Sequence, residues 1–242
     1  MITAYSPRRL ANALQLDLLT QIRYYFLPIY MILALAYVAA IRLTPLSDYA
    51  TLLLPLLLFS EPGLLGFYLA AGQLYFERNE KSLTALAVTP LRGEEYLMAR
   101  AASNGIIATL AGIVLFILVF LVPVKTLLLI PPLFLTATLF ALLGLSFSMH
   151  FDDFMAFVFA SALVQIPLAL PYLAYFGLVP VWVFAWVPSH PAIFSFSNLV
   201  SEQPSMLLYV LYLAELAVFN WLAFWWSRRV YKRRIRDRME AM

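Results

Sequence analysis

The sequence contains no cysteine, only two histidines and only eight glycines. The lack of cysteine excludes disulfides and thiolate metal sites. A metal centre needs converging ligands, and His150 has only His190 as a second histidine, so no metal site is expected. None of the glycines begins a G-x-x-x-x-G-K-[ST] pattern. The chain is therefore predicted to hold no cofactor and to bind no ATP through a P-loop of its own.

Charge is also scarce. Only 12% of the 242 residues are charged, 64% are hydrophobic, and the mean hydropathy is +0.86. Such a composition lies far outside that of soluble domains and predicts an all-α polytopic membrane protein, in which each helix needs about 20 apolar residues. Pro55 and Pro62 are candidates to break the second of six apolar stretches. The six predicted spans are 24–41, 51–76, 97–122, 126–149, 154–177 and 206–227.

The distribution of Lys and Arg gives the expected orientation. With the N-terminus inside, only Arg42 and Lys125 of the 16 Lys and Arg residues fall on the outer side. The positive-inside rule then predicts a multi-pass protein of the cell membrane with both termini in the cytoplasm. The basic tail 228–242 is expected to fix this topology and to contact anionic lipid. Residues 1–23 lack the continuous apolar core of a cleavable signal, so the first span is expected to act as an uncleaved insertion signal.

Residues 1–23 predict a helix that lies along the inner leaflet. Ser6-Pro7 is typical of an N-cap followed by proline at the first helical position. An apolar row then recurs every four residues, at Leu10, Leu14, Leu18 and Ile22. The row favours an interfacial helix, and the alternative is a plain juxtamembrane linker.

The segment 178–205 is predicted to fold back into the outer interface before the sixth span. It is too apolar for a free loop, with Trp182 and Trp186 among its aromatic residues. Four prolines make another span improbable: Pro180, Pro188, Pro191 and Pro204. An outer re-entrant segment, whose irregular backbone is buried by protein, satisfies both observations.

A charged loop, 77–96, separates the second and third spans. Ser82 can cap a short helix over residues 83–88, and Thr89-Pro90 should end it, because the residue before proline avoids the helical region. A dense polar cluster precedes this helix: Glu77, Arg78, Asn79, Glu80 and Lys81. A short apolar helix that is preceded by charged residues can bind in a groove on a partner protein. The alternative is an ordinary solvated loop that obeys the positive-inside rule.

Here the chain resembles the ABC-2 type permeases, in particular the branch labelled fluoroquinolone export permease. The family pattern is Glu-basic-x-x-Gly-Thr-Leu, then an apolar stretch, Thr-Pro-Leu, and a Tyr-bearing segment before the third span. The corresponding stretches here are Glu77–Leu83, Thr89–Leu91 and Glu95–Leu97. Lys81 stands where glycine is usual and Ser82 where threonine is usual. The order of the predicted elements resembles the family over nearly the whole chain, and the sequence motif itself is matched over about 25 residues.

The resemblance implies a membrane subunit of an ATP-driven exporter that moves a hydrophobic or amphiphilic substrate out of the cytoplasm or inner leaflet. Residues 24–227 would form its six-span domain. The chain itself would not be an enzyme. Two copies of a separate ATPase would bind ATP and Mg, and a second permease subunit, identical or paralogous, would complete the unit. The residues that would contact the ATPase are Glu77, Arg78, Glu80, Lys81, Ser82, Leu83, Thr89 and Pro90.

Two carboxylates fall within predicted spans, Glu61 in the second and Glu215 in the sixth. A carboxylate in hydrocarbon is costly, so each is expected to face the bundle interior or a wet cavity, or to carry a proton. With Asn220 they are candidates for the lining of a substrate pathway. The alternative is a structural hydrogen bond that fixes helix packing, with Asn104, Gln165 or Asn220 as partner.

Other function classes are less well supported by the residues. A membrane scaffold or assembly protein without transport activity remains the main alternative, and no pattern predicts nucleic-acid binding. Four residues lie between Glu94-Glu95 and Arg100, whereas three residues separate the paired glutamates from the arginine in the membrane prenyl-protein proteases. The cluster His150, Asp152 and Asp153 predicts an inner-face turn whose acidic residues pair with Arg92, Arg100 or the partner.

Overall fold

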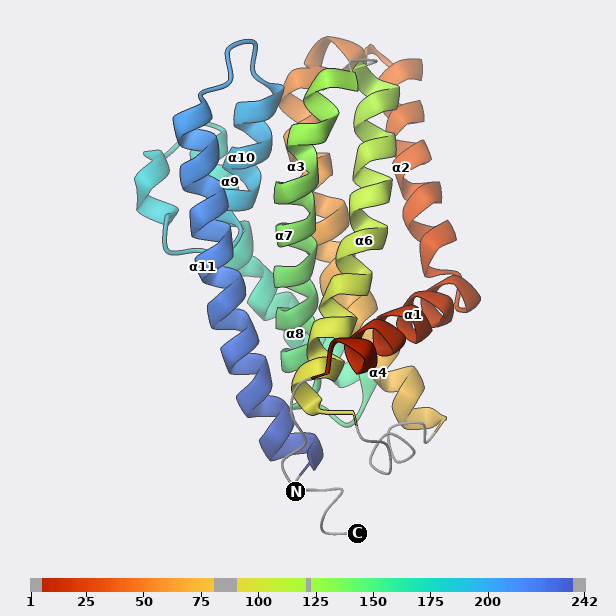
Figure 1. Cartoon of the computed structure of the whole chain (residues 1–242). Helices are drawn as coiled ribbons and strands as arrows, with labels where there is room; N and C mark the ends of the chain where they lie inside the picture. The colour runs from red at the N-terminus through yellow and green to blue at the C-terminus, as the bar shows by residue number, and fades with distance from the viewer. Residues whose placement is uncertain (1–5, 81–90, 121–122, 237–242) are drawn as a thin grey trace.

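The computed structural model describes residues 6–80, 91–120 and 123–236 (Figure 1). In these ranges the regular elements are all helical. The α-helices are α1 (Pro7–Arg23), α2 (Phe26–Leu43), α3 (Ala50–Ser60), α4 (Gly66–Asn79), α6 (Gly93–Phe120), α7 (Pro123–Ser148), α8 (Phe154–Ala169), α9 (Pro171–Tyr175), α10 (His190–Val200) and α11 (Met206–Tyr231). Two short 3₁₀ helices, η1 (Pro45–Tyr49) and η3 (Val181–Phe184), and two π-helical turns, η2 (Glu61–Leu65) and η4 (Lys232–Arg236), complete the set.

Six helical stretches among the described residues are long and apolar enough to cross a membrane. They are Phe26–Leu43, Pro45–Asn79, Gly93–Val119, Leu127–Ser148, Phe154–Tyr175 and Met206–Arg234. These stretches confirm the predicted six-span, all-α membrane fold.

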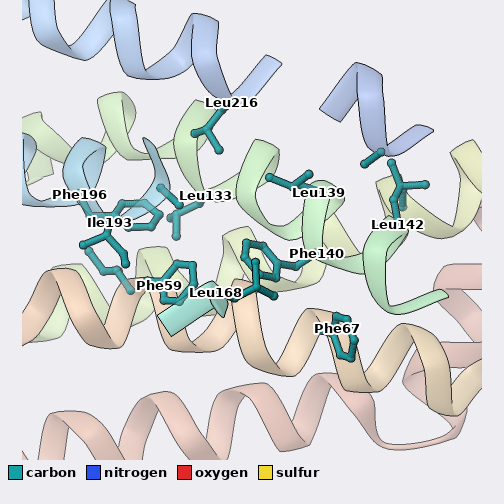
Figure 2. Packing of buried hydrophobic residues seen from close by; sticks show 14 of the residues in the cluster. Phe59, Phe67, Leu133, Leu139, Phe140, Leu142, Leu168, Ile193, Phe196 and Leu216 are labelled. Atoms are coloured by element: carbon teal, nitrogen blue, oxygen red, sulfur yellow. The ribbon is translucent and has the colours of Figure 1, made fainter. Parts of the chain in front are cut away.

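The central helix of the bundle is α7, which packs against α4, α6 and α11. Its side chains interlock with those of α3 and α4, as Figure 2 shows for Phe59, Phe67 and Phe140. The rings of Phe59 and Phe140 meet edge to face, with centroids 5.4 Å apart. At Gly144 the backbone of α7 approaches that of α4 so closely that a Cβ would overlap the carbonyl of Phe67. The core therefore depends on close helix packing of the kind that small residues permit in membranes.

The outer helices leave broad apolar faces. Large side chains are exposed on α2, α8 and α11, among them Ile32, Phe159, Leu163, Leu207 and Trp221. Lipid tails are as apolar as these side chains, so a bilayer accommodates them without burial in protein.

The second span is continuous and contains a π turn. Pro62 has no backbone N–H and cannot donate a helical bond to the preceding turn. The chain widens there into η2, and the N–H of Gly66 bonds the carbonyl of Glu61. Pro55 lies within α3. The predicted break is thus a π turn at Pro62.

α1 begins at Pro7 with Ser6 in the N-cap position, as predicted, although the Ser6 side chain makes no capping bond. Figure 1 shows α1 crosswise to the bundle, near the end where α4 and α11 finish and α6 begins. Its buried side chains are Asp17 and Gln21, while Leu16 and Leu19 are more than half exposed. Of the predicted apolar row, Leu10, Leu14 and Leu18 are half-buried, whereas Ile22 is 52% exposed. The interfacial position of α1 stays a prediction.

Segment 178–205 contains η3 and α10. α10 packs against α3, α7 and α11, and its Ile193 and Phe196 are fully buried. Pro191 lies in the first turn of α10, where a missing N–H costs nothing. Trp182 and Trp186 point outward and are 76% and 66% exposed. The segment is packed rather than free, and its re-entrant course at the outer interface stays a prediction.

Candidate functional site

The candidate docking loop connects the end of α4 to the start of α6. The structure describes its two flanks, with Glu77, Arg78 and Glu80 on one side and Arg92 on the other. The remaining predicted contact residues lie outside the described residues: Lys81, Ser82, Leu83, Thr89 and Pro90.

A buried arginine, Arg100, joins both flanks to α1. Its side chain is only 2% exposed. Nη1 lies 3.0 Å from Oδ1 of Asp17 and 2.5 Å from Oε1 of Gln73, and Nη2 forms an ion pair with Glu77. Removing one partner of such a buried pair costs about 3–5 kcal/mol, because the other charge is left uncompensated.

The carboxylates that pair with Arg100 have further donors. Asp17 accepts hydrogen bonds from Ser103 and, at 3.2 Å, from Gln21. The amide of Gln21 also donates to Ser103, at 2.7 Å. On the other side, the Tyr96 hydroxyl donates to Glu77 at 2.7 Å. We call Asp17, Gln21, Gln73, Glu77, Tyr96, Arg100 and Ser103 the inner polar network; it joins α1, α4 and α6.

Glu95 holds the start of α1 against the start of α6. Its side chain is fully buried, and its carboxylate accepts bonds from the backbone N–H of Ser6 at 3.1 Å and of Arg92 at 3.0 Å. Arg9 donates to the same carboxylate at 3.1 Å. A carboxylate in the first turn of α6 is also favoured by the helix dipole. Glu95 is thus an anchor between two helices.

The end of α11 lies on the same helix start. Arg228 pairs with Glu94 at 2.7 Å, but both side chains are well exposed, so the pair is worth about 1 kcal/mol or less. The ring of Tyr231 packs on Tyr96, with centroids 5.6 Å apart, and also lies against Gly93.

The α4 flank is held by the residue that follows α1. The hydroxyl of Tyr24 donates to the Glu80 carboxylate, and its ring stacks on Phe76 with centroids 5.2 Å apart. The hydrogen bond to Glu80 raises the pKa of Tyr24, so the phenol remains a donor at neutral pH. Glu80 immediately precedes the candidate docking loop, so this bond fixes the point where the loop leaves α4.

The turn after α7 contacts α4 through Arg78. Its guanidinium donates to the carbonyl of Phe151 at 2.6 Å, and the Tyr75 hydroxyl donates to the same carbonyl at 3.2 Å. Asp153 caps α8 by accepting from the backbone N–H of Ala156 at 2.9 Å. The turn expected at this place is present, and Arg100 forms ion pairs with Asp17 on α1 and Glu77 on α4.

The candidate pathway residues of the sixth span make bonds to neighbouring helices. Glu215 lies 3.1 Å from Nδ1 of His190 on α10. Asn220 accepts from Thr138 at 2.8 Å and donates to the carbonyl of Leu135 at 2.9 Å, which fastens α11 to α7. These contacts fix helix packing, and a role in substrate passage stays a prediction.

Glu61 lies elsewhere, in η2, and is fully buried. Within the described ranges neither of its carboxylate oxygens has a hydrogen-bond partner. The expected partner Asn104 donates instead to the Arg100 carbonyl at 3.0 Å and to Gln73 at 3.4 Å. Over the same ranges no group of three or more His, Asp or Glu side chains could hold a metal ion.

Most of the inner polar network was not among the predicted coupling residues. The sequence does carry a signal for it, because polar residues four apart share one face of a helix. Three such pairs occur beside apolar segments: Asp17 with Gln21, Gln73 with Glu77, and Arg100 with Asn104.

Comparison with known proteins covers almost the whole chain. The sequence model of the fluoroquinolones export permease protein family matches residues 8–239. Fluoroquinolones export permease proteins from two strains of Mycobacterium tuberculosis are each 31% identical over 185 residues, which is 75% of this chain and 76% of the relative. No solved structure matches significantly. The six apolar spans agree with this match, and the chain belongs to the fluoroquinolones export permease family, a branch of the ABC-2 type permeases.

Proposed function

We propose that this membrane permease is the transmembrane subunit of an ATP-driven exporter. Membership of an export permease family supports the transport role. The sequence has no P-loop, so ATP and Mg would be bound by a separate ATPase, present in two copies. A second permease subunit, identical or paralogous, would complete the unit. The substrate would be a hydrophobic or amphiphilic molecule that leaves the cytoplasm or the inner leaflet of the cell membrane.

The observation that carries this proposal is that the two flanks of the loop are bonded to one another and to the segment that contains α1. Glu80 is bonded to Tyr24, Glu77 to Arg100, and Glu95 to the start of α1. Residues 81–90 are therefore bounded by helices that are fastened to one another. A displacement imposed on this loop by an ATPase would move α1, α4 and α6 together, which is what the transmission of ATP-driven closure into the spans requires.

The proposal is tested by co-expression with a candidate cassette ATPase from the same genome, followed by purification in detergent and measurement of ATP hydrolysis. Two variants, Glu80→Lys and Leu83→Asp, alter the flank and the loop. Glu202→Lys is the matched control, because this exposed residue lies in segment 178–205.

We expect the ATPase to co-elute with the wild type and with Glu202→Lys. With either loop variant its apparent affinity should fall at least about tenfold, equivalent to ~1.4 kcal/mol. A folded, monodisperse permease that retains no ATPase would contradict the exporter and favour a membrane scaffold.

A further inference from the structure

Glu61 sits at the widest turn of the second span. In a π turn the N–H of Gly66 bonds the carbonyl of Glu61, so the two residues lie one turn apart on one face. Gly66 packs against α2 and α7, since a Cβ there would lie 3.8 Å from the Tyr30 hydroxyl and 3.6 Å from the Ala137 carbonyl. The π turn thus directs this face of the span towards Tyr30 and α7.

Unsatisfied polar atoms gather at this place. Glu61 and Tyr30 are both fully buried, and the two side chains are close enough to interact electrostatically. In the described part of the chain, neither the Glu61 carboxylate nor the Tyr30 hydroxyl has a hydrogen-bond partner. Unsatisfied buried oxygens in a native fold usually indicate a ligand or bound water, because each costs about 1–3 kcal/mol.

The apolar stretches of the neighbouring helices contain no cation that could pair with Glu61. The elements packed against η2 are α2, α3, α4, α6 and α7. Within the membrane, residues 26–41, 50–76, 101–119 and 127–148 contain no Lys, Arg or His. The other titratable side chains of these segments are tyrosines: Tyr30, Tyr37, Tyr68 and Tyr75.

Three of those tyrosines are engaged elsewhere. Tyr37 bonds Ser60, Tyr68 accepts from Ser161, and Tyr75 donates to the carbonyl of Ser148. Tyr30 is therefore the titratable group that faces Glu61. An ionised Glu61 would be an uncompensated charge in hydrocarbon.

We propose that Glu61 is an intramembrane proton-binding site, with Tyr30 as its polar neighbour. The carboxylate takes one proton from hydronium: one O–H bond forms on the carboxyl group, and one O–H bond of the hydronium breaks and leaves water. A proton suits the site better than a metal ion, because hard metal ions such as Ca²⁺ and Mg²⁺ require about six or more oxygen ligands. The site is independent of the ATPase docking proposed above, since it lies on η2 rather than in the inner polar network.

Infrared spectroscopy of the purified permease tests this proposal. The wild type at neutral pH should show the carbonyl stretch of a protonated carboxylic acid. Glu61→Gln should lack the band and Glu215→Gln should keep it. A wild-type spectrum without the band, or a band that survives in Glu61→Gln, overturns the assignment.

A second variant keeps the test decisive if Glu61→Gln does not fold. Tyr30→Phe removes the hydroxyl beside the carboxyl and should shift the frequency of the same band, whereas Tyr37→Phe should leave it unchanged. An unchanged band in Tyr30→Phe would exclude Tyr30 as a neighbour of the proton site.

Ion dependence separates a proton from an alkali cation. Thermal unfolding of the wild type is measured in sodium chloride and in choline chloride at equal ionic strength. Equal melting temperatures support the proton. A stabilisation specific to sodium that is lost in Glu61→Gln would overturn it in favour of a metal cation.

Discussion

At the residue scale, Arg100 joins α1, α4 and α6 at one end of the bundle. Its charge is compensated by Asp17 and Glu77, which come from two other helices. Such a buried ion pair contributes less to net stability than to specificity, because desolvation offsets much of the attraction. Its loss is nevertheless costly, since the carboxylates left behind cannot return to water while the fold persists.

Replacement of Arg100 by Met should therefore be strongly destabilising. We expect a loss of about 3–5 kcal/mol, because two carboxylates would remain buried without a cation. The triple variant Arg100→Met/Asp17→Asn/Glu77→Gln removes all three charges and should recover part of that loss. Arg228→Met, at an exposed ion pair, should change stability by about 1 kcal/mol or less. Denaturant unfolding in detergent measures the free energy of unfolding of each variant. Equal losses for Arg100→Met and Arg228→Met would refute the prediction.

At the element scale, helix contacts divide into those made by small apolar residues and those made by polar groups. The contact of α4 with α7 is of the first kind, because it depends on Gly144. The contact of α1 with α6 is of the second kind and depends on Asp17 and Gln21.

The close approach at Gly144 gives a second prediction. Gly144→Ala would place a Cβ against the backbone of Phe67, which cannot move as a flexible side chain does. We expect at least about 1–3 kcal/mol of destabilisation from overpacking. Gly72→Ala is the matched control, because nothing lies within 4 Å of its Cβ position, and alanine favours the helix by up to about 1 kcal/mol. The melting temperatures of both variants are compared with that of the wild type. A Gly144→Ala protein as stable as the wild type would argue against this packing.

The orientation of α1 can be measured directly because the chain has no cysteine. Spin labels on Leu16→Cys and Leu19→Cys should be accessible to oxygen, which partitions into lipid, because both side chains are exposed in the isolated chain. A label on Gln21→Cys should be immobilised and inaccessible, because that side chain is buried. If the first two labels are instead accessible mainly to a water-soluble relaxing agent, the helix does not lie in the interface.

The six spans could be predicted from the sequence, whereas the contacts between helices in the inner polar network could not. A span is a local property, since about 20 consecutive apolar residues are sufficient to define it. The hydrogen bond between Ser103 and Asp17 joins residues 86 positions apart, and the sequence around either residue does not identify the other as its partner. The same reasoning applies to α1. Its apolar row could be recognised in the sequence, whereas the burial of Asp17 and Gln21 could not. Glu61 was singled out because a lone carboxylate in a span is rare, although its neighbour Tyr30 could not be identified.

At the scale of the whole molecule, the unequal distribution of charge remains the strongest global property. The described ends of α4 and α11, the start of α6 and the crosswise α1 lie at one end of the bundle (Figure 1). This arrangement agrees with the sequence prediction that places nearly all Lys and Arg on one side of the membrane. That end is predicted to face the cytoplasm, and the accessibility of side chains from outside the cell measures its orientation.

Single cysteines provide that measurement. Arg8→Cys and Glu202→Cys lie in segments predicted on opposite sides, and both native side chains are exposed. In intact cells a membrane-impermeant maleimide should label Glu202→Cys at once and Arg8→Cys only after permeabilisation, because the positive-inside rule retains the basic segments in the cytoplasm. Wild type is the blank, since it has no thiol. The reverse pattern would place the loop 81–90 outside the cell, where no ATP-driven partner could reach it, and would contradict the exporter together with the topology.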